Sequence, residues 1–315
     1  MLDHMLTAVN AVLPCFLIIA LGLFTRMRGM VEDKALGKFN SIAFRVFLPI
    51  QIFKNVYDAP IGEIFDPRLM IFCLVGLVVS GGFALLTVTL LEPRPDRRGV
   101  MAQGMFRANY VLMGIPLVES LFGEKGIGMA AMLIAINIPV YNVLSVVFLE
   151  LYAGGKIQKR KMLHDIVTNP LIDATLAALL AKAVHFPIYT IVPLASAFRS
   201  LAGVATPLCL YILGASFAPA GVRSYARSLW ITVLFKLVVI PGLALAAAAA
   251  VGIRGIPLAV VMMSFGAPTA VNSYTMAREL GGDSELAAGI VVVCTALSCL
   301  SLFGWIVLLR ALGLF

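Results

Sequence analysis

Ten predominantly apolar stretches, each of about 20 residues, follow one another along the chain and are separated by short polar segments. An α-helix of roughly 20 residues is as long as the hydrocarbon core of a bilayer is thick. The pattern therefore predicts an all-α polytopic membrane protein with ten transmembrane helices. The stretches are residues 5–24, 35–56, 69–91, 101–121, 127–152, 166–184, 197–217, 229–251, 256–277 and 286–309.

The longest polar connection, residues 153–165, is basic and divides the chain into two halves of five stretches each. Because each half crosses the membrane an odd number of times, the second half starts from the opposite side. Two halves with a common fold would then form an inverted repeat, the first at 1–152 and the second at 166–315. Residues 121–131 and 280–290 support this repeat, since they share small and apolar positions.

The fourth stretch is interrupted at residues 109–116 by side chains that disfavour a helix. Pro116 has no N–H to donate, and its ring crowds the carbonyl of Leu112. Gly114 lacks the Cβ that would resist unwinding, and Asn109 adds both donors and acceptors. We expect the helix to break here, within the membrane.

The ninth stretch, which is the fourth of the second half, carries a similar interruption with Gly266, Pro268 and Asn272. Two breaks at equivalent positions favour a transporter with two discontinuous helices that cross near the bilayer midplane. Half-helix N-termini at such a crossing would attract an anion. The alternative is a simple proline kink in each helix. Asn109 and Asn272 would either bind substrate or hydrogen-bond the carbonyls that the breaks expose.

The fifth stretch adds a second group of polar side chains, Asn137, Tyr141 and Asn142. Asn137 and Tyr141 are four residues apart and therefore share a helix face. These side chains would either line a cavity that faces the two breaks or hydrogen-bond neighbouring helices.

The composition excludes a water-soluble domain, because the chain is 61% hydrophobic and 13% charged, with a mean hydropathy of +1.00. Soluble domains average about a quarter charged residues. The net charge of +8 would suggest nucleic-acid binding in a soluble protein, but here the basic residues lie in short loops. Of the 24 Lys and Arg residues, 14 fall in odd-numbered loops, 7 on the opposite side and 3 inside the stretches. The positive-inside rule then places the odd-numbered loops in the cytoplasm and both termini outside it.

Arg45 and Lys236 are basic residues inside the apolar stretches. A charge at the bilayer centre costs at least ~2.5–3.5 kcal/mol on insertion scales, so each needs a partner or a cavity. Few acidic residues are available within the stretches (Glu119, Glu150 and Asp173), so the buried charge leans positive and favours an anionic substrate. Lys236 would contact substrate or bond the carbonyls of an unwound helix, and Arg45 could lie nearer the surface.

The sequence shows no pattern typical of catalysis or metal binding. The five cysteines lie in apolar runs without metal-ligand spacing, and the three histidines form no catalytic cluster. No paired carboxylates, Ser with Lys or His, or His/Glu metal set falls at membrane depth. We therefore expect no enzyme, no cofactor and no metal site. A channel or receptor is a further alternative, although a channel has no need of an inverted repeat.

Several motifs resemble those of the auxin efflux carrier family, which includes plant auxin exporters and bacterial organic-acid carriers. Their order and spacing cover nearly the whole chain, and the absence of a long hydrophilic central loop makes it similar to the bacterial members. The motifs are Phe39-Asn40, Phe47-Leu48-Pro49, Asn109 through Pro116, Asn137-Ile138-Pro139 with Asn142, Asn169-Pro170-Leu171, Thr206-Pro207-Leu208, Leu213-Gly214-Ala215-Ser216, Lys236 with Pro241, and Gly266-Ala267-Pro268.

The resemblance implies two inverted repeats of five helices, with helices 4 and 9 crossing at prolines as in sodium/proton antiporters and bile-acid transporters. It also implies an elevator mechanism, in which helices 3–5 and 8–10 form a transport domain. This domain would move past a scaffold of helices 1, 2, 6 and 7, which would join two copies into a homodimer. The candidate substrate-binding residues are Asn109, Gly114, Pro116, Asn137, Tyr141, Asn142, Gly266, Pro268 and Asn272.

We expect a secondary transporter of a small organic anion in a bacterial-type inner membrane, with lipid and a small carboxylate as its partners. Malonate or malate fits the bacterial members. An auxin-like acid fits less well, because plant members arrange prolines and asparagines at the crossing differently. The alternative is a sodium-coupled organic-anion symporter of the bile-acid-transporter type. Carbonyls freed by the helix breaks could bind Na⁺. No stretch holds a paired-carboxylate proton site, which argues against a proton antiporter. Uncoupled export is a third option.

Overall fold

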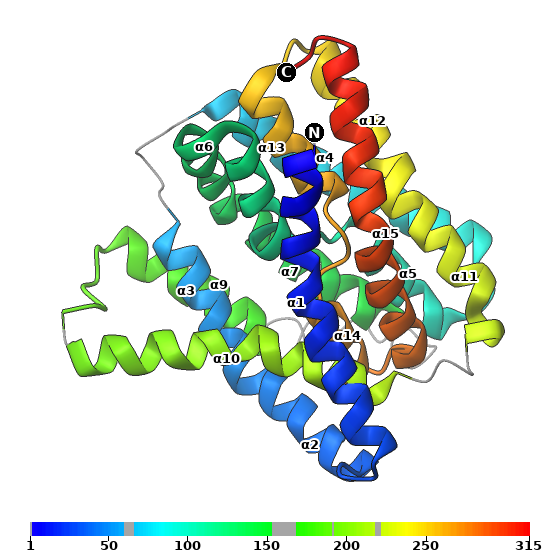
Figure 1. The fold of residues 1–315 in the computed structure, drawn as a ribbon. Coiled ribbons are helices and arrows are strands. Elements are labelled where there is room, and N and C mark those ends of the chain that lie inside the picture. The colour runs from blue at the N-terminus through cyan, green and yellow to red at the C-terminus, as the bar shows by residue number, and fades with distance from the viewer. Residues whose placement is uncertain (1, 60–65, 153–167, 191, 218–221) are drawn as a thin grey trace.

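The computed structural model describes residues 2–59, 66–152, 168–190, 192–217 and 222–315, and this part of the chain is built from helices (Figure 1). The predicted basic loop at 153–165 lies outside the described residues. In chain order the helices are α1 (Leu2–Met27), α2 (Asp33–Ile42), η1 (Ala43–Phe47), α3 (Leu48–Asp58), α4 (Pro67–Leu91), α5 (Pro95–Phe106), η2 (Tyr110–Gly114), α6 (Ile115–Met132), α7 (Ile134–Tyr152), α9 (Pro170–Ala183), α10 (Val192–Ser216), α11 (Val222–Leu234), η4 (Phe235–Val239), α12 (Ile240–Ala250), α13 (Gly255–Gly266), α14 (Asn272–Glu279) and α15 (Ser284–Ala311).

Within the described residues, five helical segments are long and apolar enough to cross a membrane: Pro67–Leu91, Lys125–Tyr152, Val192–Ser216, Arg223–Ala250 and Ser284–Ala311. Shorter apolar helices accompany them, and the outer faces carry exposed apolar side chains such as Val79, Leu90 and Leu300. Such faces suit lipid rather than water. The prediction of an all-α polytopic membrane protein is therefore confirmed, whereas the count of ten crossings and the inverted repeat stay predictions.

Three π-helices lie within the described residues, and each ends two positions before a proline. Their last residues are Phe47, Gly114 and Val239, before Pro49, Pro116 and Pro241. A proline has no N–H and its ring crowds the carbonyl four residues earlier, so an ordinary α-helical turn is disfavoured there. The wider π turn lets the helix continue past the ring.

This local geometry changes where the fourth stretch is interrupted. The helix passes through Pro116 into α6, and the non-helical backbone lies earlier, at residues 107–109 between α5 and η2. In the ninth stretch the non-helical residues 267–271 separate α13 from α14. Gly123, at a φ of 62°, interrupts α6 once more near the predicted end of the fourth stretch.

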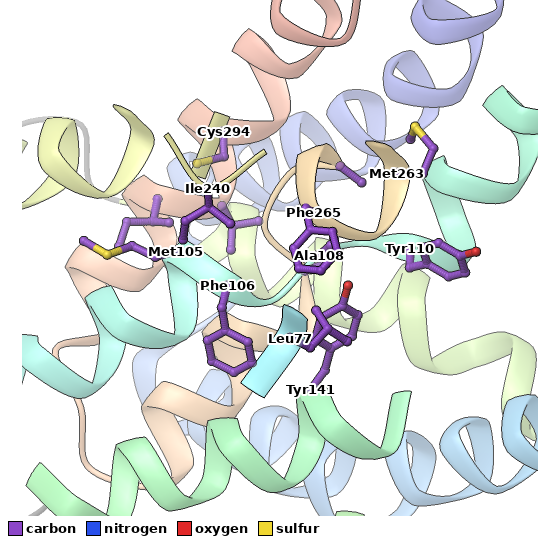
Figure 2. Close-up of a cluster of buried hydrophobic side chains, with 14 of the residues drawn as sticks. Leu77, Met105, Phe106, Ala108, Tyr110, Tyr141, Ile240, Met263, Phe265 and Cys294 are labelled. Atoms are coloured by element: carbon purple, nitrogen blue, oxygen red, sulfur yellow. The ribbon is translucent and has the colours of Figure 1, made fainter. Parts of the chain in front are cut away.

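The two interruptions meet in space. Ala108 and Thr269 form an antiparallel bridge, and the Asn109 N–H donates to the Pro268 carbonyl over 2.7 Å. The Thr269 hydroxyl also donates to the Gly104 carbonyl at 2.8 Å. Figure 2 shows the extended chain at Ala108 among the buried aromatic rings beside it. Each interruption thus supplies hydrogen-bond partners for the backbone of the other, as backbone at membrane depth requires.

Helices α1, α2, η1, α3, α9 and α10 form one packing group, in which α10 packs on α1, α2, η1 and α3, and α9 packs on α3 (Figure 1). The contact between α1 and α10 is close because both helices carry glycine there. A Cβ at Gly214 would overlap the Ile19 carbonyl, and one at Gly22 would overlap the Tyr211 carbonyl. Small residues of this kind allow membrane helices to approach backbone to backbone.

The remaining helices form a second group in which α5 packs on α4, α7 and α11, and α13 packs on α6 and α12. The crossing of the two interrupted segments lies within this group. The first group reaches the crossing through contacts of α1 with α6, α3 with α7, and α10 with α14.

Candidate functional site

A cavity of about 290 Å³ lies beside the crossing, where the two groups of helices meet. Residues from both interruptions contribute to its wall, together with side chains of α3, α7 and α10. The lining residues are Leu48, Gln51, Asn55, Arg107, Ala108, Asn109, Tyr110, Val111, Leu112, Pro116, Ile138, Tyr141, Thr206, Cys209, Ala270, Val271 and Asn272.

Arg107 places a positive charge in this wall. It follows the last residue of α5, and it is only 3% exposed. Its Nη2 donates to Asn142 Oδ1 at 2.9 Å, and its Nη1 donates to the Ser145 hydroxyl at 3.1 Å. No ion pair found in the described part of the chain includes Arg107, and its Nε is buried without a hydrogen-bond partner there.

Asn109 and Asn272 lie next to the two interruptions and both line the cavity. Asn109 precedes η2, and Asn272 is the first residue of α14. The first N–H groups of a helix have no partner within it, and that end carries partial positive charge. Asn272 Oδ1 is buried with no hydrogen-bond partner among the described residues. Two helix N-termini and two amides therefore lie at the same cavity as Arg107.

Of the three polar side chains predicted on α7, Tyr141 alone lines the cavity. Its hydroxyl donates to the Ser264 carbonyl at 2.5 Å, while Asn137 Nδ2 donates to the Ser264 hydroxyl at 2.9 Å. Asn142 holds Arg107 instead. Asn137 and Asn142 thus act behind the wall, by connecting α7 to α13 and to the end of α5.

The glycines and prolines of the two interruptions also differ in whether they line the cavity. Pro116 lines the cavity, whereas Gly114, Gly266 and Pro268 lie behind it. A Cβ at Gly114 would stand 3.3 Å from that of Met263, so this glycine lets η2 approach α13. Gly266 packs near Pro241, and the Pro268 carbonyl accepts the hydrogen bond that joins the two segments.

Neither Lys236 nor Arg45 reaches the cavity wall. Lys236 is fully buried, and its Nζ donates to the Phe265 carbonyl at 3.1 Å, at the C-terminal end of α13. The side chain of Arg45 is 71% exposed and pairs with Glu279 of α14 at 3.2 Å. Both basic groups are thus engaged by protein groups away from the cavity.

The candidate substrate-binding residues predicted from the sequence did not include Arg107, Gln51, Asn55 or Thr206, all of which line the cavity. Arg107 had a recognisable signal, since it is a basic residue inside an apolar stretch and stands two positions before Asn109. Gln51 and Thr206 had none, because their pairing at 2.7 Å joins residues 155 positions apart.

Comparison with known proteins finds transporters that match nearly the whole chain. A sequence model of the family described as "Membrane transport protein" matches residues 7–306. An uncharacterized transporter of Methanocaldococcus jannaschii is 24% identical over 95% of this chain and 98% of its own length. A second, from Methanothermobacter thermautotrophicus, is 22% identical over 95% and 98% of the two chains. A Rhizobium meliloti protein named "Putative malonate transporter" is 25% identical over 95% of each.

Proposed function

Because this chain belongs to the membrane transport protein family, the auxin efflux carrier family that its motifs resemble, we propose that it is a secondary carrier of a small organic anion. The substrate binds in the cavity at the crossing, with its carboxylate against Arg107. The observation that carries this proposal is a buried guanidinium in a cavity wall, with no carboxylate paired to it among the described residues.

The polar groups around Arg107 support an anion rather than a cation. The described residues that line the cavity include no acidic side chain. Asn109 and Asn272 can present amide N–H groups, and the N-termini of η2 and α14 add partial positive charge. A guanidinium and a carboxylate form short charge-assisted hydrogen bonds, and Arg107 Nε makes no hydrogen bond among the described residues.

The size of the cavity and one relative favour a short carboxylate such as malonate. A volume of about 290 Å³ suits a molecule of a few carbons with its ordered water. The Rhizobium meliloti relative bears the name of a malonate transporter. An auxin-like aromatic acid is the second candidate, because Leu48, Val111 and Ile138 supply an apolar side to the cavity.

We place the cavity at the interface of a moving domain and a scaffold. In this arrangement ten crossings form two inverted repeats, with α5–η2–α6 and α13–α14 as the fourth and ninth. The scaffold comprises α1, α2–η1–α3, α9 and α10, and it forms a homodimer. The two packing groups support this division, since the cavity takes its wall from both. An elevator movement of the second group then exposes the site alternately to each side.

Transport without sodium coupling is favoured over the sodium-coupled alternative. The Lys236 ammonium already places a positive charge at the C-terminal end of α13, where a half-helix would attract a sodium ion.

Uptake of labelled malonate into proteoliposomes tests the proposal, with malate and indole-3-acetate as competitors and with Na⁺ replaced by K⁺. We expect saturable uptake that does not require Na⁺. Arg107→Gln should lower it at least ~30-fold, because truncating a buried charged partner costs about 2–5 kcal/mol. The matched variant is Arg227→Gln, an exposed arginine of α11 away from the cavity. Equal uptake by the two variants would reject the site, and dependence on Na⁺ would favour the symporter.

A further inference from the structure

We propose that this protein works as an anion exchanger, because the unpaired charge of Arg107 lets the occupied site cross the membrane far more readily than the empty one. This inference rests on the proposed function. It adds a mode of transport to it, in which one carboxylate leaves on one side only as fast as another enters from the opposite side.

The charge at the cavity cannot be switched off. An arginine side chain stays protonated in proteins, and the groups around this guanidinium are all neutral. They are the Asn142 amide, the Ser145 hydroxyl, the Tyr141 carbonyl and the Met276 thioether. Among the described residues lining the cavity, Arg107 alone carries a charge.

The nearest acidic residue along α14 is already engaged. Glu279 follows Met276 by three positions, and its carboxylate accepts hydrogen bonds from Arg45 and Ser41. It therefore balances a different arginine, at the contact of α14 with α2 and η1. A bound carboxylate is the group that would balance Arg107.

Arg107 also cannot stay behind when the site moves. Asn142 and Ser145 hold its guanidinium on α7, and the Ala108–Thr269 bridge holds the adjacent backbone on the segment between α13 and α14. All of these belong to the packing group that we assign to the transport domain. An empty site would therefore carry a whole unpaired positive charge across the low-dielectric interior, whereas a site occupied by an anion of single charge, such as hydrogenmalonate, carries a neutral pair.

The difference in charge between the empty and the occupied site predicts different rates for two measurable fluxes, exchange and net flux. Exchange needs only the occupied site to cross, in both directions. Net flux needs the empty site to return, and that step also moves a positive charge through the membrane potential. Exchange should therefore be faster than net flux, and membrane potential should alter net flux much more than exchange of malonate for malonate.

The test is made at a mildly acidic pH, where malonate is largely the hydrogenmalonate monoanion. It compares uptake of labelled malonate into proteoliposomes that contain unlabelled malonate with uptake into proteoliposomes that contain sulfate. Because a buried charge at the bilayer centre is costly to move, we expect internal malonate to accelerate uptake by about tenfold or more. Equal rates under both conditions would overturn exchange while leaving the carrier function intact. No uptake of malonate under either condition, with malate and indole-3-acetate equally inactive, would overturn both.

A substitution at Asn142 gives a second, independent test. Asn142→Asp places a carboxylate 2.9 Å from Arg107 Nη2 and neutralises the empty site. We expect it to weaken malonate binding and to reduce the acceleration by internal malonate to less than about twofold, because the empty site then crosses without a net charge. Asn142→Ala is the matched control, since it removes the same hydrogen bond without adding charge and should keep the acceleration. An acceleration that persists in Asn142→Asp would contradict the proposal.

Discussion

At the scale of single residues, Arg107 and Lys236 show how two buried basic groups of one crossing take different roles. Lys236 points to the end of α13, where its Nζ donates a hydrogen bond to the Phe265 carbonyl. Arg107 leaves its Nε without a partner in the described structure and stands in the cavity wall. Burying a charge without a partner costs free energy. For Lys236 the Phe265 carbonyl offsets this cost, and we propose that a bound anion offsets it for Arg107.

The two asparagines of the crossing provide a prediction at this scale. Asn109→Ala and Asn272→Ala should each weaken malonate affinity by about 10–100-fold, because a hydrogen bond to a charged group contributes roughly 1.5–3 kcal/mol. Both variants should fold, since Asn272 Oδ1 has no partner to lose among the described residues. Isothermal titration calorimetry measures the affinity, and thermal unfolding checks the fold.

Asn169→Ala serves as the control for these variants. Its side chain caps α9 by accepting from the Leu171 N–H at 3.0 Å, and it lies outside the cavity. Losing a cap costs about 1 kcal/mol of stability, so this variant should lower Tm and keep malonate affinity. Wild-type affinity in both crossing variants would show that their amides serve only the backbone.

At the scale of elements, three prolines of the described chain follow a widened turn and do not end their helices. The fourth stretch continues through Pro116 because a π turn precedes it, and the same arrangement recurs before Pro49 and Pro241. In the fourth stretch, a sequence pattern that treats Gly-x-Pro as a break therefore places the interruption too late, whereas in the ninth stretch Pro268 does lie in the interruption. The actual interruption at residues 107–109 is stabilised by the chain that crosses it.

The packing of α1 on α10 makes a prediction about a single methyl group. Gly214→Ala should destabilise the protein by about 1–3 kcal/mol, because the new Cβ would overlap the Ile19 carbonyl and force the two helices apart. Gly203→Ala, in the same helix, meets nothing within 4 Å and should leave stability unchanged or slightly higher. Unfolding midpoints in detergent measure both, and equal midpoints would contradict close packing at Gly214.

At the scale of the whole molecule, the polar contacts of α14 connect the two packing groups. Glu279 accepts from Arg45 and Ser41, and Arg278 Nη1 donates to the Ser216 hydroxyl of α10 at 3.0 Å. If the groups move past each other during transport, these contacts must break. They therefore stabilise the arrangement seen here over the others in the transport cycle.

Glu279→Gln tests this connection. Removing the carboxylate weakens a partly exposed ion pair of roughly 0.2–1 kcal/mol, so amide hydrogen exchange in α2 (Asp33–Ile42) should become faster. Malonate affinity should stay within about threefold, because Glu279 lies outside the cavity. Asp96→Asn is the control, since its pair with Arg94 joins residues two apart in one segment. An unchanged rate of amide hydrogen exchange in α2 would show that the contact with Glu279 does not stabilise this helix.

Much of this fold follows from local properties of the sequence. Three kinds of pattern depend on residues close together along the chain. They are the apolar stretches of membrane length, the polar segments between them and the family motifs. They predict an all-α polytopic transporter, and they locate the two interrupted segments to within a few residues. They also identify Asn109, Pro116, Tyr141 and Asn272, which meet in one cavity.

The charge pattern of the site depends instead on contacts between distant residues. Arg107 meets Asn142 from 35 positions away, Lys236 meets Phe265 from 29, and Arg45 meets Glu279 from 234. No local pattern tells which buried cation finds a protein acceptor and which stays unpaired, because that depends on where the chain crosses itself. The sequence alone therefore predicted an interrupted pair of helices and an anionic substrate. Only the tertiary structure showed that Arg107 lies in the cavity wall without a paired carboxylate among the described residues, which is why we propose it as the counter-charge of the substrate.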